Sequence, residues 1–208
     1  EEDEEQQEPM TAKQINDQIQ DMLDQSIVWK QSGPALYLEG KNPEFHKLEN
    51  AVYKLGFNPM RGFFLAKVSD SFTFNYKLYG LESKLVKRVE RTYAATMNTG
   101  GNLGVLLNGV KGTGKTVTAK LMANALKQPV IVVDMKDCHQ FLNLIPQNIT
   151  IFIDEYEKVF EKSSEMLTIM DGALNSRHRR VFILTTNNLF IEENLIQRPG
   201  RIRYLKKF

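Results

Sequence analysis

The chain contains one eight-residue stretch that fits the phosphate-binding pattern G-x-x-x-x-G-K-[ST] at every fixed position. Its residues are Gly109-Val110-Lys111-Gly112-Thr113-Gly114-Lys115-Thr116. Glycines let such a loop turn tightly and point successive backbone N–H groups inward, where phosphate oxygens bind. The following helix adds its positive end, Lys115 supplies a mobile cation, and the Thr116 hydroxyl can bind magnesium. The stretch predicts a nucleotide site, and the alternative is an ordinary glycine-rich turn.

A pair of acidic residues, Asp154 and Glu155, follows the apolar run Ile149–Ile153. A magnesium nucleotide site needs one carboxylate to hold the water shell of the metal and another to orient the attacking water. We assign Asp154 to the first role and Glu155 to the second. The same pair also fits a helix N-cap followed by a first-turn acid, which needs no chemistry. The glycine-rich loop about forty residues earlier favours the catalytic interpretation.

The elements that must position these residues alternate along the chain between strands and helices. Strands that alternate with helices imply a parallel sheet with helices on both faces and with ligands at the carboxyl ends of its strands. Continuous apolar runs predict strands at 103–108, 130–133, 149–153 and 181–185, and a fifth strand is expected at 201–208. Apolar residues at helical spacing predict helices at 81–93, 116–128 and 164–176, with shorter ones ending at 145 and covering 190–197.

The first 78 residues have a different organisation. Residues 1–10 are strongly acidic and predict a disordered tail. The remainder predicts a small N-terminal α/β module over residues 11–78. Its expected elements are helices at Thr11–Trp29 and Phe45–Leu55 and a hairpin of Gly62–Val68 with Phe72–Tyr79.

Composition bounds the class of protein. Hydrophobic residues make up 42% and charged residues 25% of the 208 residues, which fits a globular chain. No apolar run is long enough to cross a bilayer, and no signal-peptide pattern opens the chain. The single cysteine, Cys138, excludes an intramolecular disulfide and favours a reducing, cytoplasmic compartment. One cysteine and three histidines do not form a zinc ligand set at sensible spacing.

The net charge of +2 conceals an uneven distribution. Six of the first eight residues are acidic, so the rest of the chain carries 27 Lys and Arg against 19 Asp and Glu, a net +8. This bias tolerates a nucleotide or an acidic partner. With the run Arg177-His178-Arg179-Arg180 it keeps a nucleic acid open as an alternative partner, although charges that precede a buried strand are commonly just solvated.

In combination these motifs resemble those of the AAA+ ATPases, and the resemblance covers Tyr79–Phe208. The glycine-rich loop is similar to the Walker A motif, and Ile151–Glu155 is similar to Walker B with its catalytic glutamate. Thr185-Thr186-Asn187 resembles the sensor-1 segment, and Arg198-Pro199-Gly200-Arg201 resembles the segment that projects arginine fingers into the neighbouring subunit. The extra strand at 130–133 separates such ATPases from kinase-like and GTPase-like relatives.

The resemblance implies a three-layer α/β P-loop NTPase sandwich over residues 79–208, with a five-stranded parallel sheet of AAA+ type, and it implies ATP and Mg²⁺ as cofactors. The implied catalytic residues are Glu155, Lys115, Asn187, Arg198 and Arg201. The implied metal ligands are Thr116 and Asp154, and the implied nucleotide-binding residues are Tyr79, Gly80, Gly109, Lys111, Gly112, Thr113, Gly114, Lys115, Thr116 and Val117. Asn188 remains an alternative to Asn187 as the sensor, and both arginines remain open as ordinary surface charges.

Arginine fingers act on a neighbouring site, so the resemblance implies a homo-oligomeric ring with six subunits as the expected number. The expected function is an ATP-driven motor that remodels or translocates a partner, with a protein as the first choice. A nucleic-acid motor or helicase loader and an ATP-binding adaptor ring are the alternatives. Members of the family continue into a helical lid after the fifth strand, and this chain stops at Phe208, so the lid is expected to be missing.

A narrower likeness is to the clade of the mitochondrial translocase of the Rieske iron–sulfur protein. It rests on the short Asp134–Asn148 connection, on Met170–Leu174 and on the two motifs after the fourth strand. The chain departs from that clade because it lacks the membrane helix. The short connection also lacks the aromatic, hydrophobic and glycine pore loop with which unfoldases grip an extended polypeptide.

Overall fold

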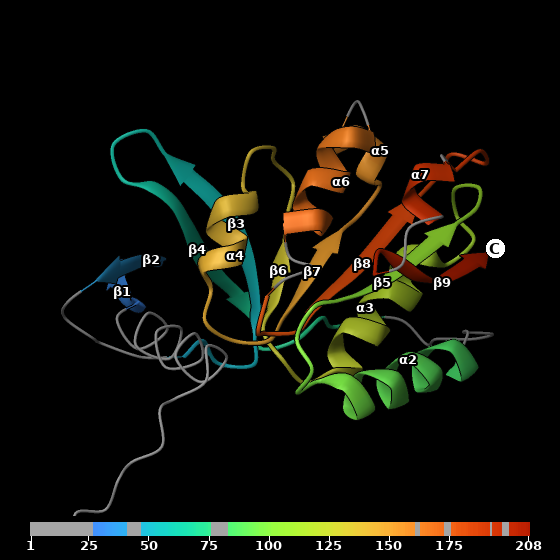
Figure 1. Cartoon of the computed structure of the whole chain (residues 1–208), viewed down its shortest axis with the longest axis horizontal. Helices are drawn as coiled ribbons and strands as arrows, with labels where there is room; N and C mark the ends of the chain where they lie inside the picture. Colours follow the sequence, from blue (N-terminus) through green and yellow to red (C-terminus); the bar gives the residue numbers. More distant parts are fainter. Residues whose placement is uncertain are drawn as a thin grey trace, which may run out of the picture.

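The computed structural model describes residues 27–40, 47–75, 83–160, 163–172, 176–191, 193–196 and 200–208. Within these ranges the strands form one nine-stranded sheet in the order β1-β2-β4-β3-β6-β7-β8-β5-β9 (Figure 1). The strands are β1 (Ile27–Ser32), β2 (Ala35–Gly40), β3 (Val52–Asn58), β4 (Gly62–Ser69), β5 (Asn102–Asn108), β6 (Val130–Val132), β7 (Ile149–Ile153), β8 (Arg180–Thr186) and β9 (Ile202–Lys207).

Five neighbouring strands, from β6 through β7, β8 and β5 to β9, are parallel, as the sequence predicts. Every residue of β5, β7 and β8 is buried, because a parallel sheet is covered by helices on both faces. Their apolar runs are therefore continuous rather than alternating. The parallel pairing brings the ends of β5, β7 and β8 to the same edge, where polar residues begin.

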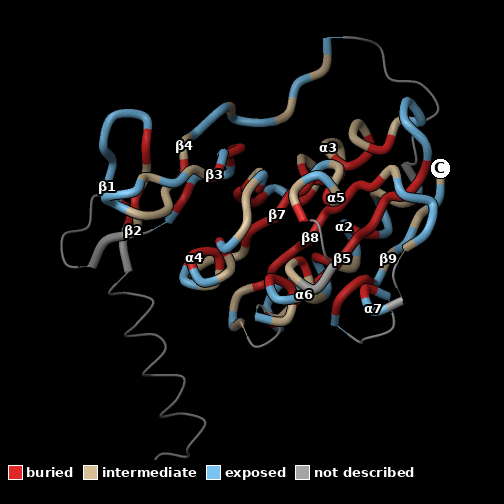
Figure 2. Tube along the Cα trace, turned by 90° about the horizontal axis from the view of Figure 1, so that it is seen from above, coloured by how far each residue is buried: buried red, intermediate tan, exposed pale blue. Residues whose placement is uncertain are grey.

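The sheet separates two hydrophobic cores, and successive residues of each strand point alternately into them. In β8, Phe182 and Leu184 join one core, whereas Val181 and Ile183 join the other. Figure 2 shows the buried strands running between the helices. Helices α2 (Ser83–Thr96) and α3 (Lys115–Ala125) cover one face, and α4 (His139–Leu144), α5 (Tyr156–Val159), α6 (Ser163–Gly172) and α7 (Glu193–Ile196) pack against the other.

The N-terminal strands extend this same sheet. β3 pairs in parallel with β6, and β4, β2 and β1 continue outward in antiparallel pairs. The sheet thus runs across the boundary that we predict between residues 78 and 79. The helix predicted at Phe45–Leu55 is wrong from residue 47 onward, because Val52–Asn58 is β3. Val52 and Leu55 suit helical spacing, but sheet pairing on both sides decides the outcome.

Two further N-terminal predictions need correction. The hairpin partner of β4 is β3, joined by a turn at Asn58–Gly62, and Phe72–Asn75 form no strand. The helix predicted at Thr11–Trp29 is wrong at its end, since Ile27–Trp29 belong to β1, and its other residues lie outside the described ranges. Trp29 is fully buried, so its apolar character serves a strand that packs on α4 through Phe141.

The basic run at 177–180 divides into an exposed and a buried half. Arg177 is exposed, whereas Arg179 and Arg180 are buried. The guanidinium group of Arg180 donates to the carbonyl oxygens of Gln147, Asn143 (3.4 Å) and Ile145 (2.6 Å), which lie at and just beyond the end of α4. Arg179 donates to Gly100 O at 2.5 Å, and desolvation lowers its pKa. Half of this cluster therefore caps backbone carbonyls inside the fold.

Arg180→Met is expected to lower the free energy of unfolding by about 3 kcal/mol, because it leaves buried carbonyl groups without a charged donor. Urea unfolding followed by circular dichroism measures the effect. The matched control Arg177→Met removes an exposed charge from the same run and should stay within about 0.5 kcal/mol. Equal stability of the two variants would contradict the capping role of Arg180.

Candidate functional site

A hollow of about 240 Å³ lies at the carboxyl edge of the parallel strands, between the loop that follows β5 and the end of β7. This is the edge at which the sequence places the nucleotide. Nine of the predicted site residues line the hollow: Lys111, Gly112, Thr113, Gly114, Lys115, Thr116, Val117, Glu155 and Asn187. Gly109 opens the same loop, and its N–H donates to Thr186 O of β8 at 3.3 Å.

The glycine-rich loop has the backbone shape that phosphate binding needs. Gly112 and Gly114 have φ values of +84° and +92°, which side chains rarely tolerate. A Cβ atom at either position would meet no atom within 4 Å, so the front of the loop is open. Gly114 directly precedes α3, an eleven-residue helix whose first N–H groups therefore point toward this open side. The residues present fit a bound phosphate chain.

Lys115 is only 5% exposed, and its Nζ atom donates to Val110 O at 2.7 Å across the loop. The Thr113 hydroxyl donates to the same oxygen at 2.9 Å. The lysine side chain therefore folds back over the glycine-rich loop and binds one of its backbone carbonyl groups. A small rotation would exchange the carbonyl oxygen for a phosphate oxygen, which is a stronger acceptor for an ammonium group.

Asp154, directly after β7, meets the loop. Its Oδ1 atom accepts from Thr116 Oγ1 at 2.8 Å and from Thr185 Oγ1 at 2.6 Å. Neighbouring oxygens in an octahedral Mg²⁺ shell are roughly 2.9 Å apart, given metal–oxygen distances of about 2.0–2.1 Å. The spacing of Thr116 Oγ1 and Asp154 Oδ1 thus suits one shared Mg²⁺. Among the described residues, no three Asp, Glu, His or Cys side chains cluster as a metal site, so phosphate and water would complete the shell.

Glu155 adopts a left-handed backbone conformation with a φ of +49°, which is rare for a residue with a side chain. Its Oε1 atom accepts from Asn187 Nδ2 at 2.6 Å, and its Oε2 atom pairs with Lys158 Nζ of α5. These two contacts, with Lys158 the stronger, hold the pKa of the Glu155 carboxyl below its usual range. The carboxylate is therefore ionised and aimed at the sensor strand.

The structure identifies Thr185 as a site residue that the sequence analysis did not single out. Its hydroxyl donates to Asp154 and accepts from the Glu155 N–H at 2.8 Å, so one side chain positions both acids. The parallel register of β7 and β8 accounts for this contact. Ile153 lies opposite Leu184, so the following residues, Asp154 and Thr185, lie side by side. Lys158 was also missed, because an i,i+3 ion pair resembles any surface pair.

Of the two asparagines that could act as the sensor, Asn187 is the one whose side chain contacts Glu155. The Asn187 side chain binds Glu155, and its backbone N–H donates to Glu157 Oε1 at 2.8 Å. Asn188 uses its backbone instead, since its carbonyl accepts from the side chain of Asn108 at the end of β5. The loop after β8 is thereby tied to both flanking strands of the site.

Not every predicted residue reaches the hollow. Arg201 is 4% exposed and forms a bidentate pair with Asp171 of α6, at 2.8 and 2.6 Å, and donates to Asn194 O at 2.5 Å. These contacts engage the guanidinium group with Asp171 and Asn194, and the role of Arg201 as a finger stays a prediction. Tyr79, Gly80 and Arg198 lie outside the described residues.

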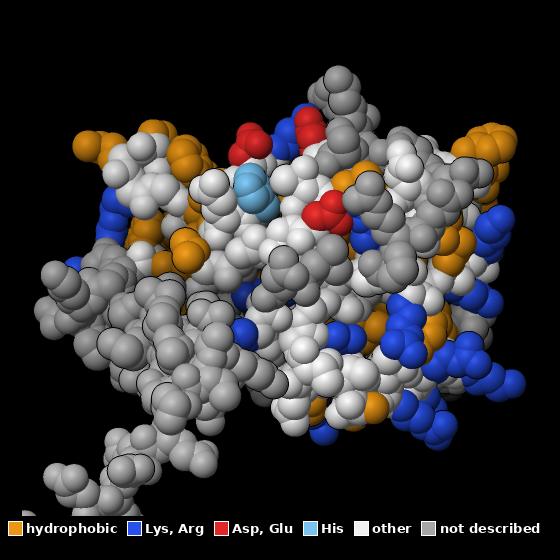
Figure 3. Space-filling view, viewed as in Figure 1, with side chains coloured by type: hydrophobic (Ala, Val, Ile, Leu, Met, Phe, Trp, Pro, Cys, Tyr) orange, Lys and Arg blue, Asp and Glu red, His pale blue; other side chains and the backbone are white. Residues whose placement is uncertain are grey.

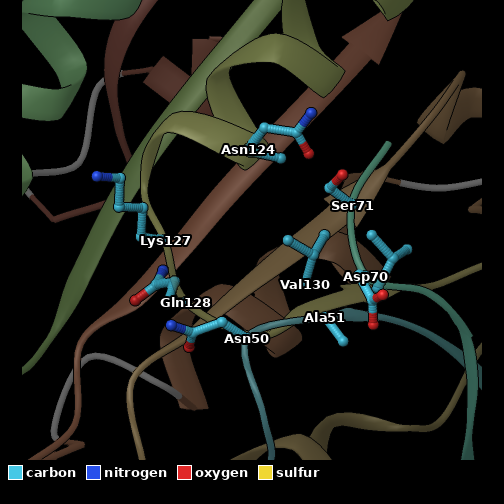
Figure 4. Close-up of a pocket in the computed structure, with 10 residues that line it drawn as sticks. Asn50, Ala51, Asp70, Ser71, Asn124, Lys127, Gln128 and Val130 are labelled. Carbon is cyan, nitrogen blue, oxygen red and sulfur yellow. The ribbon is translucent and has the colours of Figure 1, made fainter. Parts of the chain in front are cut away.

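A second hollow, of about 250 Å³, lies at the opposite edge of the sheet, where β3 and β6 begin (Figure 4). It contains no predicted site residue. The side chain of Asn124 at its border makes two hydrogen bonds to the Phe72 backbone, at 3.0 and 2.9 Å, and so ties the segment after β4 to α3.

In the described part of the chain, no helix has the length and apolarity to span a membrane.

Comparison with known proteins agrees with this geometry. Residues 105–207 match the model of the ATPase family associated with various cellular activities (AAA). The 26S proteasome regulatory subunit 6B homolog of Saccharomyces cerevisiae is 31% identical over 128 residues, which cover 48% of this chain and 30% of that subunit.

Among solved structures, PCH-2 of C. elegans matches with a TM-score of 0.45 at 15% identity, over 67% of this chain and 44% of that chain. The Thermotoga maritima RuvB Holliday junction branch migration motor matches with a TM-score of 0.41 at 22% identity, over 60% and 45%. The chain thus spans less than half of the length of each of these relatives.

The sequence match covers the strands and loops that carry the phosphate loop, the acidic pair and the sensor asparagine. The order β6-β7-β8-β5-β9, with the phosphate loop after the strand next to the edge, is an α/β P-loop NTPase arrangement. Through residues 105–207, this chain belongs to the AAA+ family of ATPases.

Proposed function

We propose that this chain hydrolyses ATP in a shared site of a homo-oligomeric ring and uses the energy to remodel a macromolecular partner. The observation that carries the proposal is one continuous hydrogen-bond network, in which the backbone N–H of Glu155 supplies one link and side chains the others. It runs from Thr116 through Asp154 and Thr185 to Glu155 and Asn187. It joins the phosphate loop, the acidic pair and the sensor strand at one hollow.

Each group has a defined task in hydrolysis. Lys115 leaves Val110 O and binds the β- and γ-phosphates, while the loop N–H groups hold the phosphate chain. Thr116 and Asp154 would hold Mg²⁺, which would supply positive charge to the phosphates. Glu155 orients a water molecule and accepts its proton as the water oxygen bonds to the γ-phosphorus and the bond to the leaving ADP oxygen breaks. Asn187 holds the Glu155 carboxylate at the correct angle.

The ring follows from the need for a cation at the γ-phosphate beyond Lys115. With Arg201 engaged by Asp171, Arg198 is the arginine that we assign to the neighbouring site. A protein is the proposed client, in keeping with the matched segment of a proteasome regulatory subunit. The nucleic-acid motor loses the support of the run at 177–180, because Arg179 and Arg180 are buried. An adaptor ring without turnover does not need the network around Glu155.

Lys115→Ala tests the proposed activity. The parent chain should release phosphate from Mg-ATP, and the variant should lose about 10²- to 10³-fold in rate, as when a charge-stabilising donor is removed from an active site. Phosphate release is measured at protein concentrations that allow assembly. Lys127→Ala, an exposed lysine just beyond α3, is the matched control and should keep the parent rate. Unchanged turnover in Lys115→Ala would overturn the proposal.

A further inference from the structure

A groove of about 670 Å³ lies between α2 and the edge strand β9, and basic side chains dominate its walls. Figure 3, drawn in the orientation of Figure 1, shows Lys and Arg side chains gathered at the lower right, where α2 and β9 lie. The lining residues are Lys84, Leu85, Lys87, Arg88, Arg91, Thr92, Tyr204, Leu205 and Lys206.

The helical wall is a stripe of cations. Lys84, Lys87, Arg88 and Arg91 follow the spacing i, i+3, i+4 and i+7, so they share one face of α2, and all four are exposed. The opposite face carries Val89 and its apolar neighbours into the core. Seven residues of helix rise about 10 Å, which matches roughly three phosphates of one B-form strand at 3.4 Å of axis each.

The strand wall has the same charge. β9 contributes Lys206 to the groove, whereas Arg203 and Lys207 belong to the same strand but do not line the groove. A hydrogen bond of 2.6 Å between Thr92 Oγ1 and Tyr204 Oη joins helix and strand, so the two walls are held at a fixed distance. The Tyr204 hydroxyl is engaged in this contact, and no other aromatic side chain lines the groove.

The four cations of the α2 wall are not neutralised by carboxylates of the described residues. α2 and β9 together carry seven Lys and Arg and one acid, Glu90, and no carboxylate lines the groove. Among the described residues, no ion pair involves Lys84, Lys87, Arg88 or Arg91. An alternative explanation is that the charges on β9 prevent the edge strand from pairing with other chains. That explanation does not account for the four cations on α2.

We propose that the groove between α2 and β9 binds the phosphate backbone of a nucleic acid without reading its bases. Unpaired cations in a row, an apolar floor at Leu85 and the lack of a stacking aromatic fit backbone contact. This goes beyond the proposed hydrolysis and does not depend on it. The groove also adjoins the phosphate loop, because Lys207 pairs with Asn108 and the Phe208 N–H donates to Asn108 O at 2.8 Å.

Fluorescence anisotropy with a labelled thirty-base oligonucleotide, single-stranded and as a duplex of unrelated sequence, tests the proposal in the absence of ATP. The full chain should bind both, and the logarithm of affinity should fall linearly with the logarithm of salt concentration. Lys87→Glu/Arg91→Glu should weaken binding by about tenfold or more and reduce the salt slope by about two. The milder Lys87→Gln/Arg91→Gln guards against a folding defect and should shift affinity in the same direction.

The matched control is Lys47→Glu/Lys127→Glu, which changes net charge equally at two exposed positions outside the groove. Retained affinity in this control, with loss in the groove variants, supports the proposal. Equal loss in both would show a general charge effect and overturn it. A third outcome would assign the groove to an acidic protein segment: a peptide of residues 1–10 binds in the groove, and a chain that begins at Thr11 binds no oligonucleotide. This outcome would also overturn the proposal.

Discussion

Glu155→Gln is expected to bind Mg-ATP with nearly unchanged affinity and to hydrolyse it about 10² to 10⁴ times more slowly than the parent chain. The amide keeps the size of the side chain and can still accept a hydrogen bond from Asn187, so the loop after β8 should stay in place. It cannot accept a proton from water, which is the role that we propose for the carboxylate. Phosphate release and binding of a fluorescent ATP analogue separate the two effects.

Glu90→Gln supplies the control for this substitution. It removes an exposed carboxylate of α2 that does not line the nucleotide hollow, and it should keep the parent rate. Loss of ATP binding in Glu155→Gln would show that the residue supports the loop rather than the chemistry. Retained turnover would remove Glu155 as the base.

Arg198→Ala is expected to slow ATP turnover by about 10³-fold or more while leaving the fold intact, the effect seen when an arginine finger is removed. Arg201→Ala should behave differently. It breaks the pair with Asp171 and the contact with Asn194, so it should lower the free energy of unfolding by about 2 kcal/mol. Thermal unfolding and phosphate release, measured on both variants, distinguish a finger from a structural arginine.

Mixing subunits tests whether Arg198 acts on a neighbour. Rings of Glu155→Gln alone and of Arg198→Ala alone should both be inactive. A mixture should recover part of the activity, because a site with Glu155 from one subunit and Arg198 from the other is intact. Absence of recovery, in rings that demonstrably mix, would contradict action between subunits. Full activity of Arg198→Ala would contradict the finger itself.

The nucleotide loop, the acidic pair and the sensor asparagine could be predicted because each depends on a short local pattern. The glycines at 112 and 114 adopt the positive φ values that their type allows, and the buried run Ile149–Ile153 delivers Asp154 to the sheet edge. Thr185 could not be singled out from its own surroundings. Its role depends on the register between β7 and β8, which is a pairing between segments about thirty residues apart.

The N-terminal strands show the opposite case. Residues 48–55 suit a helix by their apolar spacing, yet Val52–Asn58 forms β3 because β4 and β6 offer it hydrogen-bonding partners on both sides. The spacing of apolar residues within a segment carries no information about a partner strand that lies about eighty residues away in the sequence. The predicted hairpin is also wrong, since β4 pairs with the strand before it and not with the segment after it.

The sequence by itself determined the motifs of this protein: a phosphate loop followed by an acidic pair at the end of a buried strand, in the order of a AAA+ ATPase. These features are local, since glycine conformation, strand propensity and side-chain type act within a few residues. Only the tertiary structure decided which charges remain free to act. Arg179, Arg180 and Arg201 bind groups inside the fold, whereas the α2 cations remain exposed beside β9, because burial and pairing depend on neighbours that distant parts of the chain supply.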